Sequence, residues 1–257
     1  MADKNVFNEV PENLGFYEEA IPVNWEEFRK VAESRRSIRI YKDDPIPESV
    51  MRDCLRLTTL APSSSNLQPW EFYWVRNLEK KAKIVECCLS QPAAKTAQEL
   101  VVCVARTDTW NRNRKWMVER LKKEPNTPPV AFAYYEKLIF WVNYQGPCSI
   151  LAPLKWLLVS SIGLFKVMPR FPFGKKGLMM WAVKSTALAC ENLMLSLRAA
   201  GYDSCPMEGF DEVKVRKLLG LPSNALPMMI ISAGKRKPEC MYGPQIRFDQ
   251  KHYVFEV

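Results

Sequence analysis

The segment Trp181–Ala200 has apolar side chains on nearly every face of a helix, including Leu188, Leu193 and Leu197. Gly201 follows it at the position where helices commonly end in a left-handed residue. A helix that is apolar on most faces has to be buried. The chain therefore needs a substantial core around this segment, and a subunit interface is a natural way to cover the rest of it.

Two continuous apolar runs of strand length, Leu100–Ala105 and Met228–Ser232, are typical of central strands in a sheet. Glu71–Val75 predicts a further strand, whereas Tyr202–Phe210 is expected to be a loop. Capping residues and apolar patterns predict five shorter helices. Their approximate ranges are 24–35, 47–60, 77–89, 130–142 and 211–220.

No internal repeat and no linker divides the sequence, so we expect one domain over residues 1–257. Residues 1–22 are predicted to form an N-terminal arm. Residues 107–176 are expected to be a hydrophobic insertion, and residues 235–257 a C-terminal tail that is partly extended.

The most hydrophobic piece of that insertion is Cys148–Met168. A membrane-spanning helix needs about 20 mainly apolar residues, and here Pro153, Lys155 and Lys166 interrupt the run. We therefore predict a protein-covered helix pair or a lid. Contact with a membrane surface remains a less favoured alternative. Cations lie beside aromatic residues in this region: Lys155, Lys166, Arg170, Lys175 and Lys176 with Trp156 and Phe165.

The net charge of +9 suits a phosphate-bearing ligand, a nucleic acid or an anionic membrane, and does not choose among them. No block of five or six like charges occurs, so the usual basic tail of a nucleic-acid-binding protein is missing. Eight cysteines without a CxxC pair, and His252 as the single histidine, argue against a metal site. Buried free thiols and an N-terminus unlike a signal peptide predict a cytoplasmic protein.

The motifs of glycine-rich nucleotide-binding loops, GxxxxGK[ST] and GxGxxG, are both missing, and the chain has only 10 glycines. There is no GxSxG, and the single histidine lies close to the C-terminus, which argues against a Ser–His or Cys–His hydrolase. Few side chains are therefore able to perform difficult chemistry by themselves. An enzyme with this composition would rely on a cofactor.

Four polar segments are candidates for binding, and each also has a plain structural interpretation. Ala61–Trp70 holds a block of hydroxyl and amide side chains that suits either a helix cap or a polar ligand. Arg35–Arg39, if extended, places alternate side chains on one face, either to grip a phosphate or as a solvated cluster. Arg247 could reach the same phosphate or equally be a surface residue on an edge strand. Cys205–Phe210 forms either a turn with free backbone N–H groups or a simple connection.

Taken together, these segments resemble the FMN-dependent nitroreductase family. The motifs occur in order as Arg-Arg-Ser-x-Arg, Pro-Ser-Ser-Ser-Asn-x-Gln-Pro-Trp, Ala-Gly-Tyr, Pro-Met-Glu-Gly-Phe-Asp and Ile-Ser-Ala-Gly-Lys. The resemblance covers about residues 30–106 and 177–250. It implies an α+β fold with a central, mainly antiparallel sheet flanked by helices. It also implies an intertwined homodimer in which each tail, 235–257, embraces the other subunit and adds a strand to its sheet.

The resemblance further implies that FMN lies in each of two interface clefts. Arg35 and Ser37 match residues that hold the phosphate and ribityl chain, with Arg36 adjacent, and Arg247 matches a second phosphate ligand. Arg39 and Gln91 match residues near the pyrimidine edge of the flavin. Two loops complete the implied site: Pro62, Ser63, Ser64 and Asn66 from the other subunit, and Pro206, Met207, Glu208 and Gly209 over the flavin ring.

By the same resemblance, a backbone N–H at Glu208 or Gly209 is bonded to flavin N5, and no side chain is required as a catalytic acid or base. We expect ping-pong transfer of hydride from NADH or NADPH through FMN to nitroaromatics or quinones. The alternatives are a same-fold enzyme that dehalogenates reductively or consumes flavin, and a non-catalytic flavin-binding protein at a membrane surface.

Aromatic residues of the insertion are the candidates for contact with a small-molecule acceptor, if the insertion forms a lid. They are Tyr134, Phe140, Trp141, Tyr144 and Trp156. An enlarged core or dimer surface is the equally weighted alternative for this insertion. Neither nucleic acid nor metal is an expected partner.

Overall fold

The computed structural model describes residues 18–125, 127–170 and 172–257. Most of the predicted N-terminal arm, 1–22, therefore lies outside the described residues. A four-stranded antiparallel sheet has the strand order β1-β2-β4-β3. The strands are β1 (Trp70–Trp74), β2 (Glu99–Arg106), β3 (Asp203–Met207) and β4 (Ala225–Gly234). The predicted antiparallel sheet flanked by helices is thus confirmed.

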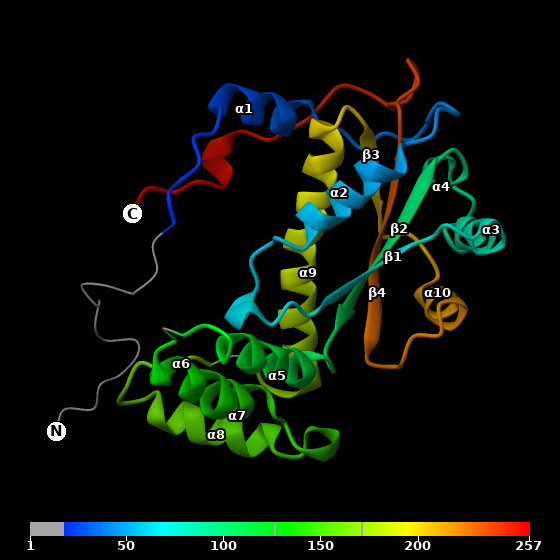
Figure 1. The fold of residues 1–257 in the computed structure, drawn as a ribbon. Helices are drawn as coiled ribbons and strands as arrows, with labels where there is room; N and C mark the ends of the chain where they lie inside the picture. Colours follow the sequence, from blue (N-terminus) through cyan, green and yellow to red (C-terminus); the bar gives the residue numbers. More distant parts are fainter. Residues whose placement is uncertain (1–17, 126, 171) are drawn as a thin grey trace.

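The central strand β2 supplies both faces of the core, because successive side chains point to opposite sides. Leu100, Val102 and Val104 pack against α3 (Leu78–Cys87), α4 (Pro92–Lys95) and α10 (Glu212–Leu218). Val101 and Cys103 pack on the other face against α2 (Glu48–Thr58) and α9 (Gly174–Ala199). Figure 1 shows these two helical layers with the sheet between them.

Capping residues define several of these helices as the sequence predicts. Asn24 caps α1 (Trp25–Ser34) by accepting hydrogen bonds from the backbone N–H groups of Glu26 and Glu27. Asn77 caps α3 and Asp211 caps α10 in the same manner. Satisfying otherwise unpaired N–H groups fixes where each helix begins.

The helix predicted at Trp181–Ala200 begins earlier, at Gly174, and runs to Ala199 as α9. Gly201 follows with φ of +84°, which is the left-handed conformation expected after a helix end. Leu193 and Leu197 are fully buried, whereas Leu188 is 47% exposed. The prediction that this helix belongs to the core is therefore confirmed for one side of it.

The prediction of a loop over Tyr202–Phe210 is wrong for its first half, because Asp203–Met207 forms β3. Pro206 argued for a loop, since proline cannot donate to a strand ladder. β3 is an edge strand, paired only with β4 among the named strands, and an edge is where a missing N–H is tolerated.

The insertion folds into short helices beyond one end of α9 (Figure 1). They are α5 (Trp110–Leu121), α6 (Pro129–Ala133), a π-helical segment η2 (Tyr134–Ile139), α7 (Phe140–Asn143), a 3₁₀ turn η3 (Pro147–Ser149) and α8 (Ala152–Ile162). The predicted helix over 130–142 is confirmed, with an unpredicted π-helical centre. The predicted covered helix pair over Cys148–Met168 is wrong: the described part holds one helix, α8, and much of it is exposed.

Seven cysteines are free and buried, as expected for thiols packed as small apolar groups: Cys54, Cys87, Cys88, Cys103, Cys190, Cys205 and Cys240. Burial raises the pKa of Cys88 to about 12 and that of Cys54 to about 11. These two thiols therefore stay protonated at neutral pH.

Candidate functional site

A cationic cavity of about 400 Å³ lies between the segment after α1 and the C-terminal tail. Five residues that the sequence singles out line it: Arg35, Arg36, Ser37, Arg39 and Arg247. The remaining lining residues come from 241–246 and include no carboxylate. The structure thus brings together the four arginines and the serine that were expected to act together.

The segment 35–41 is held in an extended form against the end of the sheet. Ser37 forms a bridge with Ser204 of β3, and the N–H of Ile38 donates to the Ser204 carbonyl over 3.1 Å. Ile38 and Tyr41 are fully buried. Tyr41 lies so close to Gly234 that a Cβ there would be 2.8 Å from the tyrosine. With Ile38 turned inward, Ser37 and Arg39 on either side of it line the cavity.

The tail closes the other side of the cationic cavity. Arg36 donates to the carbonyl of Gly243 over 2.7 Å, and the Arg39 guanidinium lies 4.6 Å from the ring centroid of Tyr242. Neither Tyr242 nor Gly243 was predicted to belong to the site. Their signal in the sequence is a turn-forming Tyr-Gly-Pro that precedes Arg247.

The electrostatics of this cavity favour an anion. Arg35 forms an ion pair with Glu191 at 3.6 Å, and no other ion pair involves the four arginines within the described parts of the chain. Burial raises the pKa of the neighbouring Cys205 thiol, while the charges of Arg39 and Arg35 oppose that rise. Guanidinium groups and a hydroxyl, with no carboxylate lining the cavity, are a donor set that fits a phosphate group.

The segment Pro206–Gly209 continues from this cavity along β3. Gln91 donates from Nε2 to the carbonyl of Gly209 over 3.2 Å, so two sequence-predicted residues meet here. In the described structure the backbone N–H groups of Glu208 and Gly209 donate to no acceptor. Glu208 also lines a hollow of about 330 Å³ beside Val183 of α9. This segment therefore offers free backbone donors beside α9.

The hydroxyl-rich loop, 61–70, has an unusual backbone. Ser65, Asn66 and Gln68 have φ values of 54°, 49° and 46°, a left-handed conformation that is uncommon for residues other than glycine. The 3₁₀ turn η1 (Ser64–Asn66) lies at its centre. Such strain persists only where surrounding contacts impose it, and it is common at ligand-binding loops.

Those contacts come from the insertion. The hydroxyl of Ser65 lies 2.7 Å from that of Tyr134, and the Tyr135 hydroxyl donates to the Ser65 carbonyl over 3.1 Å. Asn113, which is buried, donates to the carbonyls of Leu67 and Gln68 over 2.8 and 3.2 Å. The loop and the insertion therefore form one unit.

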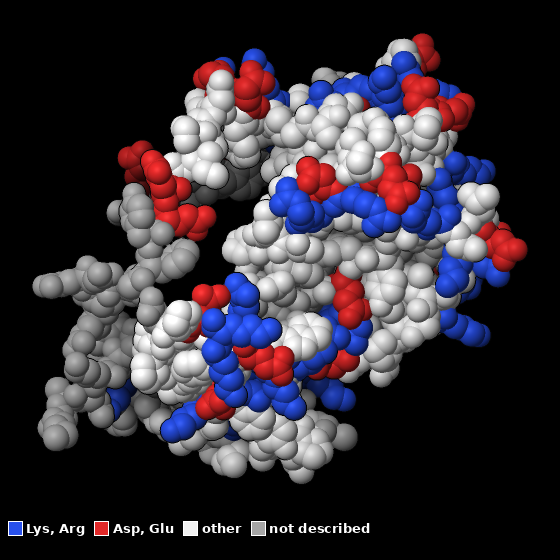
Figure 2. All heavy atoms as spheres, viewed as in Figure 1, with Lys and Arg blue, Asp and Glu red and all other residues white. Residues whose placement is uncertain are grey.

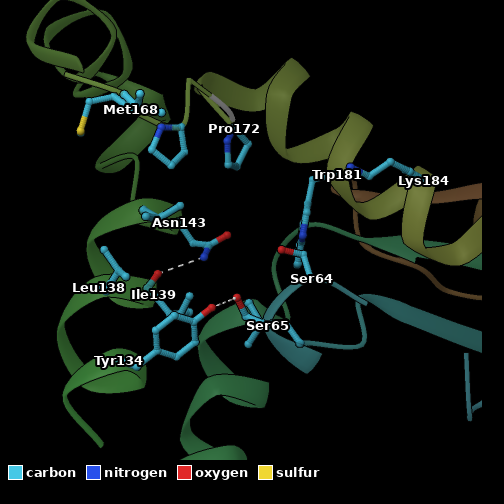
Figure 3. Close-up of a pocket in the computed structure, with 14 residues that line it drawn as sticks. Ser64, Ser65, Tyr134, Leu138, Ile139, Asn143, Met168, Pro172, Trp181 and Lys184 are labelled. Carbon is cyan, nitrogen blue, oxygen red and sulfur yellow. Dashed lines mark hydrogen bonds between the residues drawn. The ribbon is translucent and has the colours of Figure 1, made fainter. Parts of the chain in front are cut away.

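A second cavity of about 630 Å³ lies between this loop, η2 and the start of α9. Figure 3 shows Ser64, Tyr134, Asn143 and Trp181 facing the cavity from separate elements, with Met168 and other apolar residues around it. The cavity is mainly apolar, with a few polar groups at fixed points. This combination is typical of a site for a small organic molecule.

Of the five predicted acceptor residues, Tyr134 lines the second cavity and the others lie elsewhere on the insertion. Phe140 stacks on Tyr144 with ring centroids 5.2 Å apart. Trp141 lies 4.5 Å from the amine of Lys155, and Trp156 is 56% exposed. Five residues that line the second cavity were not predicted from the sequence: Ser65, Leu138, Asn143, Trp181 and Lys184. Trp181 and Lys184 are three residues apart on α9, which places them on one face of the helix.

The two cavities lie near opposite ends of α9. Arg198, near its C-terminal end, donates to the hydroxyl of Ser34, next to the cationic segment. Trp181 and Lys184 line the second cavity instead. Fourteen residues of helix separate Lys184 from Arg198, about 21 Å along the axis. One chain therefore does not bring the hydroxyl-rich loop to its own cationic cavity.

The nitroreductase family model matches residues 32–235, which is most of the chain and includes the cationic segment, the hydroxyl-rich loop and β3. This chain belongs to the nitroreductase family. Family membership makes it an oxidoreductase of the NAD(P)H- and FMN-dependent type.

Two relatives align over most of the chain. The chain is 28% identical over 206 residues to an NADH dehydrogenase of Thermus thermophilus, covering 80% of this chain and 85% of that one. It is 26% identical over 228 residues to the NAD(P)H nitroreductase homologue YdgI of Bacillus subtilis, covering 83% and 90%.

Solved nitroreductase structures have the same fold. The nitroreductase-type protein YdfN of Bacillus subtilis superposes with a TM-score of 0.72 at 21% identity, covering 91% of this chain and all of that one. A nitroreductase-type protein of Exiguobacterium sibiricum, solved in complex with FMN, superposes with a TM-score of 0.64 at 23% identity. The superposition covers 90% of this chain and 97% of that one. The predicted nitroreductase-like α+β fold is confirmed.

Proposed function

We propose that this nitroreductase binds FMN at the cationic cavity and passes reducing equivalents from NADH or NADPH to nitroaromatics or quinones. The observation that carries the proposal is the convergence of Arg35, Ser37, Arg39 and Arg247 on one cavity. Such a donor set matches a phosphate with an adjoining polar chain. The FMN complex of the Exiguobacterium relative supports the choice of this cofactor.

In this proposal Arg35, Ser37 and Arg247 hold the phosphate and ribityl chain, and Arg39 lies at the pyrimidine edge. When bound, FMN supplies the hydride-carrying chemistry. A free backbone N–H at Glu208 or Gly209 would donate to flavin N5, and Gln91 fixes this segment through the Gly209 carbonyl. The positive charge of Arg39 favours negative charge on the ring.

The chain itself contributes binding and orientation, with no side chain as general acid or base. Nicotinamide and acceptor then occupy the same space in turn, which gives ping-pong kinetics. Tyr134 and Trp181 line the same cavity as Ser64, so the subunit that contributes Ser64 to a site would also supply these two as apolar walls for a flat acceptor. Ser64 and Asn143 orient its polar groups.

The complete site is proposed to need two chains. Pro62, Ser63, Ser64 and Asn66 lie far from the cationic cavity of their own chain, so the partner subunit would supply them. The tail leaves large apolar side chains uncovered: Ile246 is 71% exposed, Phe248 73% and Phe255 72%. Met180 of α9 is 64% exposed. A homodimer in which each tail embraces the other subunit would cover such surfaces.

Flavin binding tests the cationic cavity directly. Purified protein should be yellow and should retain FMN through gel filtration. Arg35→Ala with Ser37→Ala should weaken FMN affinity about 100-fold, because it removes charge-assisted hydrogen bonds to the phosphate. Arg56→Ala with Ser223→Ala makes the same chemical change at exposed positions outside the cavity and should retain FMN. Unchanged affinity in the first variant would refute the phosphate site.

The reaction is tested separately by anaerobic titration. NADH or NADPH should bleach the flavin absorbance, and a quinone or nitroaromatic should restore it. Bleaching by neither nucleotide would refute the oxidoreductase function and favour a non-catalytic flavin protein. Halide release from a halophenol, or loss of intact flavin, would instead identify one of the same-fold alternatives.

A further inference from the structure

The short helix α8 is oriented the opposite way from an ordinary surface helix. Lys155 and Val159 face inward, with relative exposures of 8% and 2%. Leu154, Leu157 and Leu158 face outward, with exposures of 64%, 57% and 49%. Surface helices of globular proteins normally bury their apolar stripe and expose their charges. Here the cation is inside and the leucines are outside.

Lys155 fixes this orientation. Its amine donates to the carbonyls of Trp141, Val142 and Tyr144, at the C-terminal end of α7. These carbonyls have no partner within a helix that ends there. The Val142 carbonyl also accepts from Gln145 Nε2, so rotation of the α8 leucines inward would remove the Lys155 donor from the carbonyls of Trp141 and Tyr144.

The apolar surface continues past the end of α8. Leu164 is 77% exposed, Phe165 88%, and Val167 is fully exposed. We define the α8 patch as the exposed residues Ile150, Leu154, Trp156, Leu157, Leu158, Leu164, Phe165 and Val167. Isolated exposed apolar residues are ordinary, but a contiguous patch of this kind marks an interaction surface.

The charges in the segment that carries the α8 patch have one sign. Residues 137–190 contain seven lysines and arginines and no aspartate or glutamate. At the chain's average of 28 acidic residues in 257, these 54 residues would carry about six. Figure 2 shows blue and red intermingled over α2 and α5, and uncharged side chains along the lower edge where Figure 1 places α8.

Four of these cations, Lys166, Arg170, Lys175 and Lys176, are exposed close to the patch in sequence. None of the four forms an ion pair with any residue that the structure describes. Exposed leucine, tryptophan and phenylalanine beside unpaired lysine and arginine are the composition of interfacial membrane segments.

We propose that the α8 patch docks this enzyme onto an anionic lipid surface. The leucines and aromatic side chains would enter the headgroup boundary, and the four cations would contact lipid phosphates. α8 spans about 16 Å, roughly half of the hydrocarbon thickness. No helix in the described residues is long and apolar enough to cross a membrane. The contact is therefore one with the surface.

A second copy of the chain is the competing occupant of the patch. Lysine is depleted at protein–protein interfaces, and here unpaired lysines accompany the patch. The tail and the exposed face of α9 already supply uncovered apolar surface for a subunit contact. The tail lies at the opposite end of α9 from α8 (Figure 1). Lipid therefore accounts for the patch better than a partner subunit does.

The docking also assigns a class of acceptor, a consequence that rests on the proposed function. Val167 belongs to the α8 patch and also lines the second cavity, together with Met168 and Pro169. An acceptor dissolved in the bilayer would meet this border of the cavity directly. The structure therefore favours a lipophilic acceptor, such as a long-chain quinone, over a freely soluble one.

Vesicle flotation with the full-length protein tests the docking. Vesicles of phosphatidylcholine containing phosphatidylglycerol should carry the protein upward, and vesicles of phosphatidylcholine alone should carry much less. High salt should release the protein, because the cationic contribution is screened. Failure to float with anionic vesicles, or equal binding to neutral ones, would overturn the proposal.

Substitutions distinguish binding through the α8 patch from nonspecific association with vesicles. Leu154→Glu with Leu158→Glu should weaken vesicle binding by roughly 100-fold or more, since two inserted side chains become charged. Leu78→Glu with Val213→Glu is the matched control, on exposed residues of α3 and α10 (79% and 57%). It makes the same change in charge and should bind as the unmodified protein does. Equal losses in both pairs would overturn the assignment of the patch.

The cations form a second pair of variants. Lys166→Gln, Lys175→Gln and Lys176→Gln together should weaken binding to anionic vesicles about 100-fold, at about fivefold per cation. Lys80→Gln, Lys83→Gln and Lys217→Gln remove equal charge from exposed positions elsewhere and should have little effect. Sedimentation of Leu154→Glu with Leu158→Glu should show an unchanged oligomeric state. A smaller assembly would instead assign the patch to a subunit interface and refute lipid docking.

The acceptor class has its own readout. With NADH or NADPH supplied, a long-chain quinone in anionic vesicles should be reduced faster than a short-chain analogue in solution, and Leu154→Glu with Leu158→Glu should abolish the difference. A protein that floats but reduces neither quinone refutes the proposed function and leaves the docking standing. A protein that reduces both equally without floating refutes the docking alone.

Discussion

Helices α8 and α9 both have strongly apolar sequences, but they differ in which side chains they bury. α9 places Leu193 and Leu197 against the sheet, where both are fully buried, and it also contacts α1 and α2. α8 buries a lysine and exposes Leu154 and Leu157. Apolar content therefore predicts that the side chains of a helix need to be buried. The neighbouring elements decide whether the same chain or another surface buries them.

The largest effect is expected on the buried side of α9. Leu193→Ala should lower the free energy of unfolding by about 2–5 kcal/mol, because it opens a cavity between α9 and the sheet. Urea denaturation measures the loss. Leu188→Ala, on the exposed side of the same helix, is the control and should cost less than about 1 kcal/mol. Equal losses would show that both sides of α9 are covered.

The fold was largely predictable because its signals are local. Asn24, Asn77 and Asp211 fix helix starts by hydrogen bonds to backbone N–H groups a few residues away. The two apolar runs are typical of central strands, and both form central strands of the sheet. β3 was missed because Pro206 weakens a strand pattern unless the strand lies at an edge, and edge position is a property of the whole sheet.

The next effect concerns the lysine that orients α8. Lys155→Met keeps most of the side-chain volume and removes the donor of the Trp141 and Tyr144 carbonyls, while the Val142 carbonyl keeps its bond from Gln145 Nε2. We expect a loss of about 1–3 kcal/mol, the usual range for hydrogen bonds to a charged group. Urea denaturation measures the loss. Lys166→Met, at an exposed lysine of the following turn, is the control and should be nearly neutral.

The effect of Lys155 should depend on pH with a defined sign. Burial lowers the pKa of its amine in the folded chain. Between that lowered pKa and the ordinary lysine value, the unfolded chain holds more protons, so the stability of the unmodified protein rises with pH. The difference in stability from Lys155→Met should therefore grow across this alkaline window. A difference that shrinks instead would mean that contact with the carbonyls outweighs burial.

The geometry of the cationic segment could be predicted from the sequence, but that of the hydroxyl-rich loop could not. Arg35–Arg39 is an extended segment, so alternation in the sequence already places Ser37 and Arg39 on one face. The hydroxyl-rich loop depends on Tyr134, Tyr135 and Asn113 from a distant segment, and this dependence has no local signal. The left-handed backbone of Ser65 is likewise imposed from outside the loop.

A smaller effect is expected where the insertion holds that loop. Tyr134→Phe removes the 2.7 Å contact between hydroxyl groups that ties Ser65 to η2. We expect a loss of about 1 kcal/mol in unfolding free energy and faster amide exchange at Ser65 and Asn66. Tyr144→Phe is the control, since its hydroxyl makes no hydrogen bond within the described residues. Unchanged exchange in Tyr134→Phe would show that Asn113 and Tyr135 hold the loop without it.

The smallest effect on stability is expected on the outward face of α8. Leu157 is 57% exposed, so Leu157→Ser should change the unfolding free energy by less than about 0.5 kcal/mol in the lipid-free protein. Val159→Ser, two residues away and 2% exposed, should cost about 2 kcal/mol or more. This contrast within one helix repeats the contrast between α9 and α8. If Leu157→Ser proved as costly as Val159→Ser without lipid, another protein surface would cover α8, and its exposed leucines would be part of an assembly.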